Sequence, residues 1–190
     1  MAPFAGLFFL VVAFYALSSR FKGTEVGIVS NDQLPFTSEW SRGKTPEYCE
    51  AVTSVNTENQ LSFAVDCPAI QTVAIQKVAL HHGIKLTPSQ LDRLKTLSFL
   101  ATTVENLPAL LSLQDYQYRQ AIELERRNPL SEKQLAECLS AAKASRTLPH
   151  MPIHFAFKIS PEVKMGQVGH LFDVFQSLGI SRYSLYTQVK

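Results

Sequence analysis

The stretch Ile153-His154-Phe155-Ala156-Phe157-Lys158-Ile159 decides the fold of this chain. Its bulky apolar side chains alternate with histidine, alanine and lysine, which is the pattern of a half-buried β-strand. An amphipathic helix is expected next, ending at Gly179. Its apolar residues at helical spacing are Val168, Leu171, Phe172, Phe175 and Leu178. Residues 183–189 are expected to form a second strand, and a strand, helix and strand this close together predict a right-handed βαβ unit with both strands in one sheet.

A β-hairpin is predicted further toward the amino terminus, with its turn at residues 56–60. Alternate residues share one face of each strand, namely Cys49, Ala51, Thr53 and Val55 in the first and Leu61, Phe63, Val65 and Cys67 in the second. Pairing these faces across the turn places Cys49 opposite Cys67. Two alternatives follow: a disulfide, if the two Cα atoms lie about 5.5 Å apart, or two separate buried thiols, which we favour. The third cysteine, Cys138, is expected on a helix face beside Leu139 and Ala142.

Helices are expected between the hairpin and the βαβ unit. One should cover 68–82 and stop at Gly83, with three inward side chains, Val73, Ala74 and Val78. Two later helix starts, Leu86–Leu91 and Leu130–Leu135, each combine a hydroxyl N-cap with a glutamine three residues on, which closes a capping box. The Leu- and Gln-rich stretch 106–127 between them is expected to be helical. The folded part of the chain is therefore predicted to be α+β.

The first 19 residues carry no charged side chain. As a helix, this segment would span roughly 26–28 Å, which approaches a bilayer core of about 30 Å. Three alternatives stay open: a transmembrane anchor, which we favour, the apolar region of a cleaved signal peptide, and a buried core helix. A signal peptide normally has a positive n-region, and a core helix normally has some polar residues on one face. Taken alone, Arg20 and Lys22 would hold the carboxyl-terminal side in the cytoplasm.

Composition and motifs exclude several classes of protein. With 46% hydrophobic and 18% charged residues the chain should fold, and 190 residues suffice for one domain with an appendage. A net charge of +2 provides no basic field for nucleic acid. The sequence has no nucleophile elbow, phosphate loop or metalloprotease motif, so we expect neither enzyme activity nor a cofactor.

Other polar groups favour ordinary structural roles. A zinc site is not expected, because the three cysteines lack ligand spacing and His81 and His82 are adjacent residues that point in different directions on a helix. Glu123 and Glu125, followed by two arginines, indicate a solvated helix face.

The order of these parts resembles the ExbD/TolR family of biopolymer transport proteins. Residues 1–17, which read MAPFAGLFFLVVAFYAL, are similar to the family's membrane segment, usually written Asp-Met-Thr-Pro-x-x-Asp followed by apolar residues. Residues 168–187 are similar to its final helix, Gly-Ile turn and last strand. The resemblance implies a transmembrane helix at 1–19, a linker at 20–47 and a periplasmic domain at 48–190, with an insertion at about 83–128.

The resemblance also implies a location and a function. Members are single-pass proteins of the inner membrane with a periplasmic carboxyl-terminal domain, in complexes that use proton flow to energise outer-membrane transport. The implied partners are an ExbB/TolQ-like pore subunit, a TonB/TolA-like energy transducer and a second copy of the chain. The family's proton-carrying Asp corresponds to Gly6, which cannot bind a proton. Proton coupling by this chain is therefore in question, and the alternative is a periplasmic binding or scaffold module without transport coupling.

Overall fold

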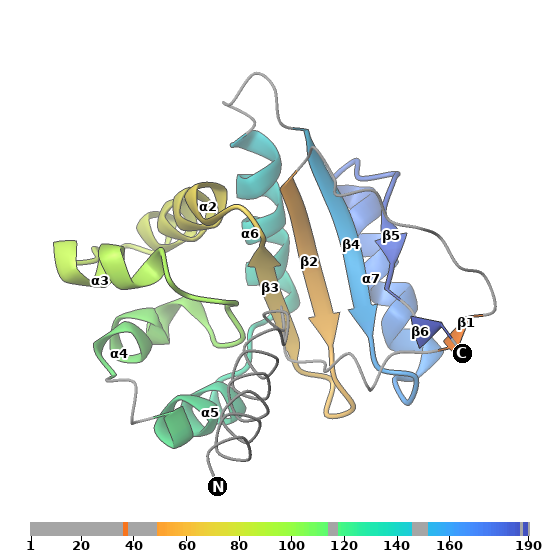
Figure 1. Cartoon of the computed structure of the whole chain (residues 1–190), viewed down its shortest axis with the longest axis horizontal. Coiled ribbons are helices and arrows are strands. Elements are labelled where there is room, and N and C mark those ends of the chain that lie inside the picture. Colours follow the sequence, from red (N-terminus) through yellow and green to blue (C-terminus); the bar gives the residue numbers. More distant parts are fainter. Residues whose placement is uncertain (1–35, 38–48, 114–117, 146–151, 187, 190) are drawn as a thin grey trace, which may run out of the picture.

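The computed structural model describes residues 36–37, 49–113, 118–145, 152–186 and 188–189. Its centre is a mixed sheet of four strands in the order β3-β2-β4-β5 (Figure 1). The strands are β2 (Cys49–Val55), β3 (Leu61–Val65), β4 (Ile153–Ile159) and β5 (Ser184–Leu185). β2 and β3 are antiparallel, whereas β4 runs parallel to both of its neighbours. The predicted α+β class is confirmed.

The β2–β3 hairpin has the predicted register, with Ala51 opposite Val65. Its turn is closed by Asn56, whose side-chain oxygen accepts hydrogen bonds from the amides of Glu58 and Gln60 at 3.0 and 2.9 Å. An asparagine side chain can replace a backbone partner in this way, which is why it favours tight turns.

The strand–helix–strand unit at the carboxyl end is also present. Helix α7 (Met165–Ser177) joins β4 to β5, and the two strands lie parallel in one sheet. The ring of Phe157 is the centre of an aromatic cluster, with centroid distances of 4.2 Å to Phe175, 5.3 Å to Phe172 and 5.1 Å to Tyr183. Aromatic pairs at these separations combine a large buried area with favourable ring geometry. The cluster therefore fixes the face of the sheet against which α7 packs.

Two further helices, α2 (Pro68–His81) and α6 (Glu132–Ala144), lie on the same face of the sheet as α7 (Figure 1). Between them and the sheet lies an apolar core whose fully buried side chains include Phe63, Ile75, Leu135, Leu139 and Leu171. Gly83 follows α2 with φ 74°, the left-handed conformation expected of a helix stop.

The described part of the range 83–128, namely residues 83–113 and 118–128, forms a helical layer beside the hairpin edge (Figure 1). It contains α3 (Pro88–Leu94), a 3₁₀ turn η3 (Val104–Asn106), α4 (Leu107–Ser112) and α5 (Tyr118–Arg127). Isolated bridges from Phe63 to Leu100 and from Leu61 to Leu130 continue the pairing beyond β3. The outer edge of β3 is thereby covered, which removes an unpaired strand edge from this side of the sheet.

The stretch 106–127, expected to be helical, contains two helices, α4 and α5. Helix α4 ends at Ser112, and its C-cap, Leu113, is extended with ψ 143°. An extended residue breaks the chain of i to i−4 hydrogen bonds, so the leucine-rich and charged halves of this stretch become separate helices.

The prediction of a half-buried β4 is also wrong. Ala156 and Lys158, which were expected to alternate outward, are only 0% and 4% exposed. β4 lies between two parallel neighbours in the middle of the sheet, where both faces of a strand are commonly removed from water. Val73 was expected to point inward from α2 but is 41% exposed, because the buried stripe of that helix runs through Ala74 and Val78 instead.

The second capping box is only half formed. Ser131 accepts the expected hydrogen bond from the amide of Gln134, but the Gln134 side chain turns away from the helix start. Its oxygen accepts from the amide of Val104, and its nitrogen donates to Glu105. At the first helix start, Thr87 and Gln90 form the complete box.

The predicted last strand is divided between two sheets. Residues 184–185 belong to the main sheet, whereas β6 (Gln188–Val189) pairs in parallel with β1 (Phe36–Thr37), a two-residue strand inside the expected linker. Within the described ranges, no helix has both the length and the apolar character needed to cross a membrane. The expectations for residues 1–19 and for Gly6 lie outside these ranges.

Candidate functional site

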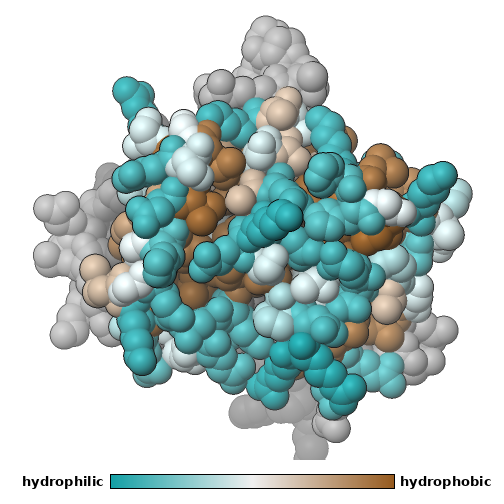
Figure 2. All heavy atoms as spheres, turned by 180° about the vertical axis from the view of Figure 1, so that it is seen from behind, coloured by the Kyte–Doolittle hydropathy of each residue, from teal (hydrophilic) through white to brown (hydrophobic). Residues whose placement is uncertain are grey.

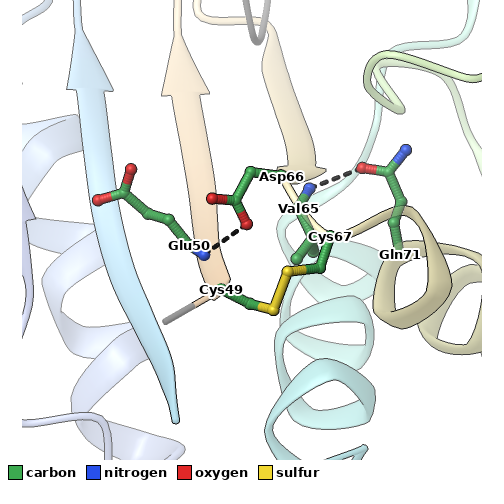
Figure 3. Close-up of a disulfide and its surroundings, with 6 residues drawn as sticks. All are labelled: Cys49, Glu50, Val65, Asp66, Cys67 and Gln71. Atoms are coloured by element: carbon green, nitrogen blue, oxygen red, sulfur yellow. Dashed lines mark hydrogen bonds between the residues drawn. A yellow bond between two sulfur atoms is a disulfide. The ribbon is translucent and has the colours of Figure 1, made fainter. Parts of the chain in front are cut away.

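The candidate site lies where the open end of the hairpin meets the start of α2 (Figure 3). Here Cys49, the first residue of β2, and Cys67, just before α2, are joined by a disulfide with a Cα–Cα distance of 5.6 Å. The favoured expectation of two separate thiols is therefore wrong. The hairpin register had placed the two residues opposite each other, and the backbones come close enough for the bond to form.

The two sulfur-bearing residues differ in their access to solvent. Cys49 is fully buried, whereas Cys67 is partly exposed. Cys67 is also the N-cap of α2, and its side chain makes no capping hydrogen bond. The next residue, Pro68, has no N–H, and the first turn of α2 contains no acidic side chain. One sulfur of the pair is thus buried, and the other stands at the positive end of a 14-residue helix.

Asp66 places a carboxyl group beside the disulfide. One of its oxygens and the two sulfurs lie within 4.8 Å of one another. The oxygen Oδ1 accepts a hydrogen bond from the amide of Glu50 at 2.7 Å (Figure 3). Partial burial raises the pKa of Asp66 above its usual value, although hydrogen bonds from the amides of Glu50, Cys67 and Asp66 itself oppose the shift.

Gln71, on α2, connects the elements at the corner where the open end of the hairpin meets the start of this helix. Its side-chain oxygen accepts a hydrogen bond from the amide of Val65 at 2.6 Å, and its nitrogen donates to the carbonyl of Leu97. The residue is 2% exposed. Gln71 therefore connects β3, α2 and residues 83–128 without involving either sulfur.

A polar row continues from the corner across the face of the sheet that points away from α7. In the parallel register Glu50 lies next to His154. Phe155 and Phe157 of the same strand contact Phe175 of α7, and since strand side chains alternate between the two faces, Glu50 and His154 lie on the other face. Tyr186 donates a hydrogen bond to the carboxylate of Glu50. Nε2 of His154 lies 2.8 Å from Oγ of Ser184. The row connects β2, β4 and the chain around β5.

A second cluster of titratable groups surrounds His82, at the end of α2. Its Nδ1 lies 3.1 Å from Glu105 and its Nε2 lies 2.6 Å from Glu137. The Gln134 side chain donates to both carboxylate oxygens of Glu105 at 3.0 and 2.8 Å. Together with other hydrogen bonds and the charge of His82, this bond lowers the pKa of Glu105. An imidazole held at both nitrogens is suited to clamping three elements together, not to ligating a metal ion.

Sequence reasoning missed this cluster. It treated His82 only as a poor zinc ligand, and no spacing pattern relates residues 82, 105 and 137. Among the described residues, the only three metal-type ligands close enough to share an ion are Cys49, Asp66 and Cys67. The two sulfurs of that group are bonded to each other, so the oxidised site has no thiolate to offer a metal.

Two other expectations can be checked here. Cys138 lies on α6 and is fully buried with its neighbours Leu139 and Ala142, as predicted. Burial raises the pKa of the Cys138 thiol to about 12, with a smaller contribution from the charge of Glu137. The solvated face expected for α5 is only partly correct, because burial raises the pKa of Glu125 to about 7.

Exposed apolar side chains occur at the β5 edge and on the helices. Tyr183, Leu185 and Tyr186 are 36%, 52% and 39% exposed and lie at or beside β5. On the helix side, Val73 and Leu80 are exposed on α2. Figure 2, which shows the molecule from behind the view of Figure 1, has apolar areas at several places among hydrophilic ones.

No protein-family model matches this chain, and neither does any curated protein or solved structure. What the site can do is therefore argued from its own geometry.

Proposed function

We propose that this chain is a membrane-anchored, ExbD/TolR-like component of a complex that couples the proton-motive force to biopolymer transport across the outer membrane. The resemblance at residues 1–17 and 168–187 supports this function, as does the order of hairpin, helices and closing βαβ unit. Because Gly6 replaces the proton-carrying carboxylate, the chain takes part as an accessory subunit and carries no proton in its own membrane helix.

The observation that carries the proposal is the disulfide between Cys49 and Cys67. Disulfides form and persist in oxidising compartments such as the periplasm and are rare in the cytosol. A disulfide-containing domain that follows an uncharged segment of 19 residues supports an anchor in the inner membrane with the domain outside it. This orientation is opposite to the one that Arg20 and Lys22 alone would favour.

The β5 edge supports a role in binding partners. The exposed side chain of Leu185 stands on this two-residue strand at one end of the sheet, and the exposed Tyr186 directly follows the strand. Exposed strand edges accept an additional strand from another chain. In the proposed complex, an ExbB/TolQ-like pore holds residues 1–19, and the domain meets a TonB/TolA-like transducer or a second copy of the chain.

The location can be tested with the full chain expressed in a Gram-negative host. We expect the protein in the inner-membrane fraction and a reporter fused after Lys190 to be active in the periplasm. The matched control is a reporter fused after Lys22. This fusion contains the uncharged segment but not the folded domain. A full-length product in the soluble fraction would exclude an anchored component.

Association with a pore subunit can be tested at Gly6. The Gly6→Asp variant should insert poorly when expressed alone, because a carboxylate in a bilayer costs about 3 kcal/mol. Co-expression with an ExbB/TolQ-like pore should restore insertion, and Gly6→Ala should insert normally in both cases. If the pore does not restore insertion of Gly6→Asp, this helix does not occupy such a pore.

A second candidate function is a periplasmic binding or scaffold module without transport coupling. The observation that favours it is the helical layer at 83–128, which covers the outer edge of β3 and is absent from the family pattern. Photo-crosslinkers at Leu10 and at the exposed Asp92 separate the two functions. Crosslinks from Leu10 to a pore subunit favour transport, whereas crosslinks from Asp92 alone favour the module.

A further inference from the structure

We propose that the Cys49–Cys67 disulfide is a redox-active site that exchanges with an external dithiol, with Cys67 as the sulfur that is attacked and Cys49 as the sulfur that leaves. The inference does not depend on the transport function, since it concerns only the corner between the hairpin and α2.

The first support is the difference in access between the two sulfurs. An attacking thiolate must approach along the sulfur–sulfur bond, and Cys49 is 0% exposed. Cys67 is partly exposed and lies among exposed neighbours, Asp66, Pro68 and Ala69. Exchange therefore has one open direction, through Cys67.

The second support is the position of Cys67 at the start of α2. Partial positive charge at a helix N-terminus stabilises a thiolate. Pro68 has no N–H to offer, but the side chain of Cys67 makes no capping hydrogen bond and the first turn of α2 contains no acidic residue. In the second step of the exchange, when Cys67 is released from the mixed disulfide, its thiolate is thus a better leaving group than that of an ordinary cysteine. The carboxyl of Asp66 lies close to both sulfurs and has a role of its own.

The third support is the carboxyl of Asp66, which lies within 4.8 Å of both sulfurs. A carboxyl with a raised pKa holds a proton more readily than an ordinary one. It can give a proton to the sulfur of Cys49 as that sulfur leaves, and it can take the proton back when the disulfide forms again. This transfer matters at a buried sulfur, because an unprotonated thiolate there would be poorly solvated.

The fourth support is that the corner does not need the disulfide to keep its shape. The hairpin pairs residues 51–55 with 61–65, and Asn56 closes its turn. Gln71 joins β3 to α2 and to Leu97 through its own hydrogen bonds. Reduction therefore leaves the two thiols in position for the bond to form again.

The exchange has two balanced steps. A thiolate of the external dithiol attacks Sγ of Cys67, the bond to Cys49 breaks, and Cys49 leaves with the electron pair and accepts a proton from Asp66. The second thiol of the dithiol, once deprotonated, attacks the external sulfur of the mixed disulfide, and Cys67 leaves as a thiolate. The external dithiol is oxidised to a disulfide and releases its two protons to the solvent. The cysteine pair gains two electrons; Cys49 keeps the proton from Asp66, and Cys67 and Asp66 are each protonated again from the solvent.

The experiment uses the full chain in its folded state, with dithiothreitol as the dithiol and oxidised glutathione as the trapping disulfide. Alkylation followed by peptide mass spectrometry measures which cysteines are reduced over time. We expect reduction without denaturation, with Cys138 unlabelled as the internal control of folding. In the Cys49→Ser variant, oxidised glutathione should form a mixed disulfide on Cys67, whereas Cys67→Ser should leave Cys49 unmodified.

Asp66→Asn tests the proton transfer. We expect the rate of reduction to fall about 100-fold and its pH dependence to change, while the exposed control Asp92→Asn behaves like the parent. An unchanged rate and pH profile would exclude a proton-transfer role for Asp66. If the disulfide is reduced only after the protein unfolds, or if glutathione modifies Cys49 instead of Cys67, the bond is a purely structural crosslink and the proposal is wrong.

Discussion

The imidazole of His82 lies against the carboxylate of Glu137, with Nε2 2.6 Å from Oε2, although the two residues are 55 positions apart. On its other side the same ring meets Glu105. Both ring nitrogens of His82 thus have a carboxylate within hydrogen-bonding distance. The end of α2 is thereby tied to α6 and to the helical layer at 83–128.

Removing this clamp should destabilise the domain. His82→Ala should lower the free energy of unfolding by about 1–2 kcal/mol, because hydrogen bonds to charged partners are lost from a half-buried site. Urea unfolding of the full chain measures the effect. His81→Ala is the matched control, since His81 is an exposed neighbour at the same helix end, and equal losses in the two variants would contradict the clamp.

Glu105 should make the free energy of unfolding depend on pH in the acidic range. Its folded-state pKa is lowered, chiefly by the hydrogen bond from Gln134. The stabilisation is therefore present above the ordinary pKa of 4.5 and is lost as the pH falls through the lower, folded-state value. Glu105→Gln should flatten the dependence of the unfolding free energy on pH below 4.5. The exposed Glu132→Gln serves as the control, and parallel curves for parent and Glu105→Gln would refute the expectation.

Glu125 should change the pH dependence of the unfolding free energy in the opposite direction. Burial raises its folded-state pKa to about 7, so the protonated form is favoured by folding. Its contribution is complete below the ordinary pKa of 4.5 and is lost as the pH rises through about 7. Glu125→Gln should therefore be more stable than the parent at pH above about 7, by about 1 kcal/mol after allowance for solvent screening. Thermal unfolding at several pH values measures the difference.

The control for Glu125 is Glu123→Gln on the same helix. Glu123 forms an exposed ion pair with Arg127 at 3.1 Å, and its loss should cost less than about 0.5 kcal/mol at any pH. A gain in stability from both variants would indicate a general effect of net charge instead of burial.

The disulfide should contribute to stability as well as to exchange. The two cysteines are 18 positions apart, and closing a loop of this size is worth about 3 kcal/mol in the chain-entropy model. The double variant Cys49→Ala/Cys67→Ala should lose about that amount in urea unfolding. In denaturant without a reductant, a thiol reagent should label Cys138 alone in the parent and no cysteine in Cys138→Ser. Labelling of three cysteines would rule out the bond.

Local pattern was enough to predict most elements of this fold. Alternation in 49–67 predicted the hairpin and its register, since side chains of a strand point to opposite faces in turn. Helical spacing in 168–178 and a nearby strand pattern predicted the βαβ unit, and the Thr87 capping box marked a helix start that the structure contains. The pairing of Cys49 with Cys67 followed from the same register. The register did not predict whether the disulfide forms, because register alone does not set the distance between two sulfurs.

Tertiary structure decided the features that depend on residues far apart in sequence. Lys158 alternates like an exposed strand residue, yet in the folded chain it is only 4% exposed, on a strand in the middle of the sheet. Gln134 has the spacing of a capping residue, yet its side chain turns to Val104 and Glu105, which only the folded layer brings within reach. Hydrogen bonds and desolvation act over a few ångströms in space, whereas spacing rules act over a few positions in the chain. The carboxyls around His82 and the solvent access of the two sulfurs depend on such short distances in space, and so only the folded chain determines them.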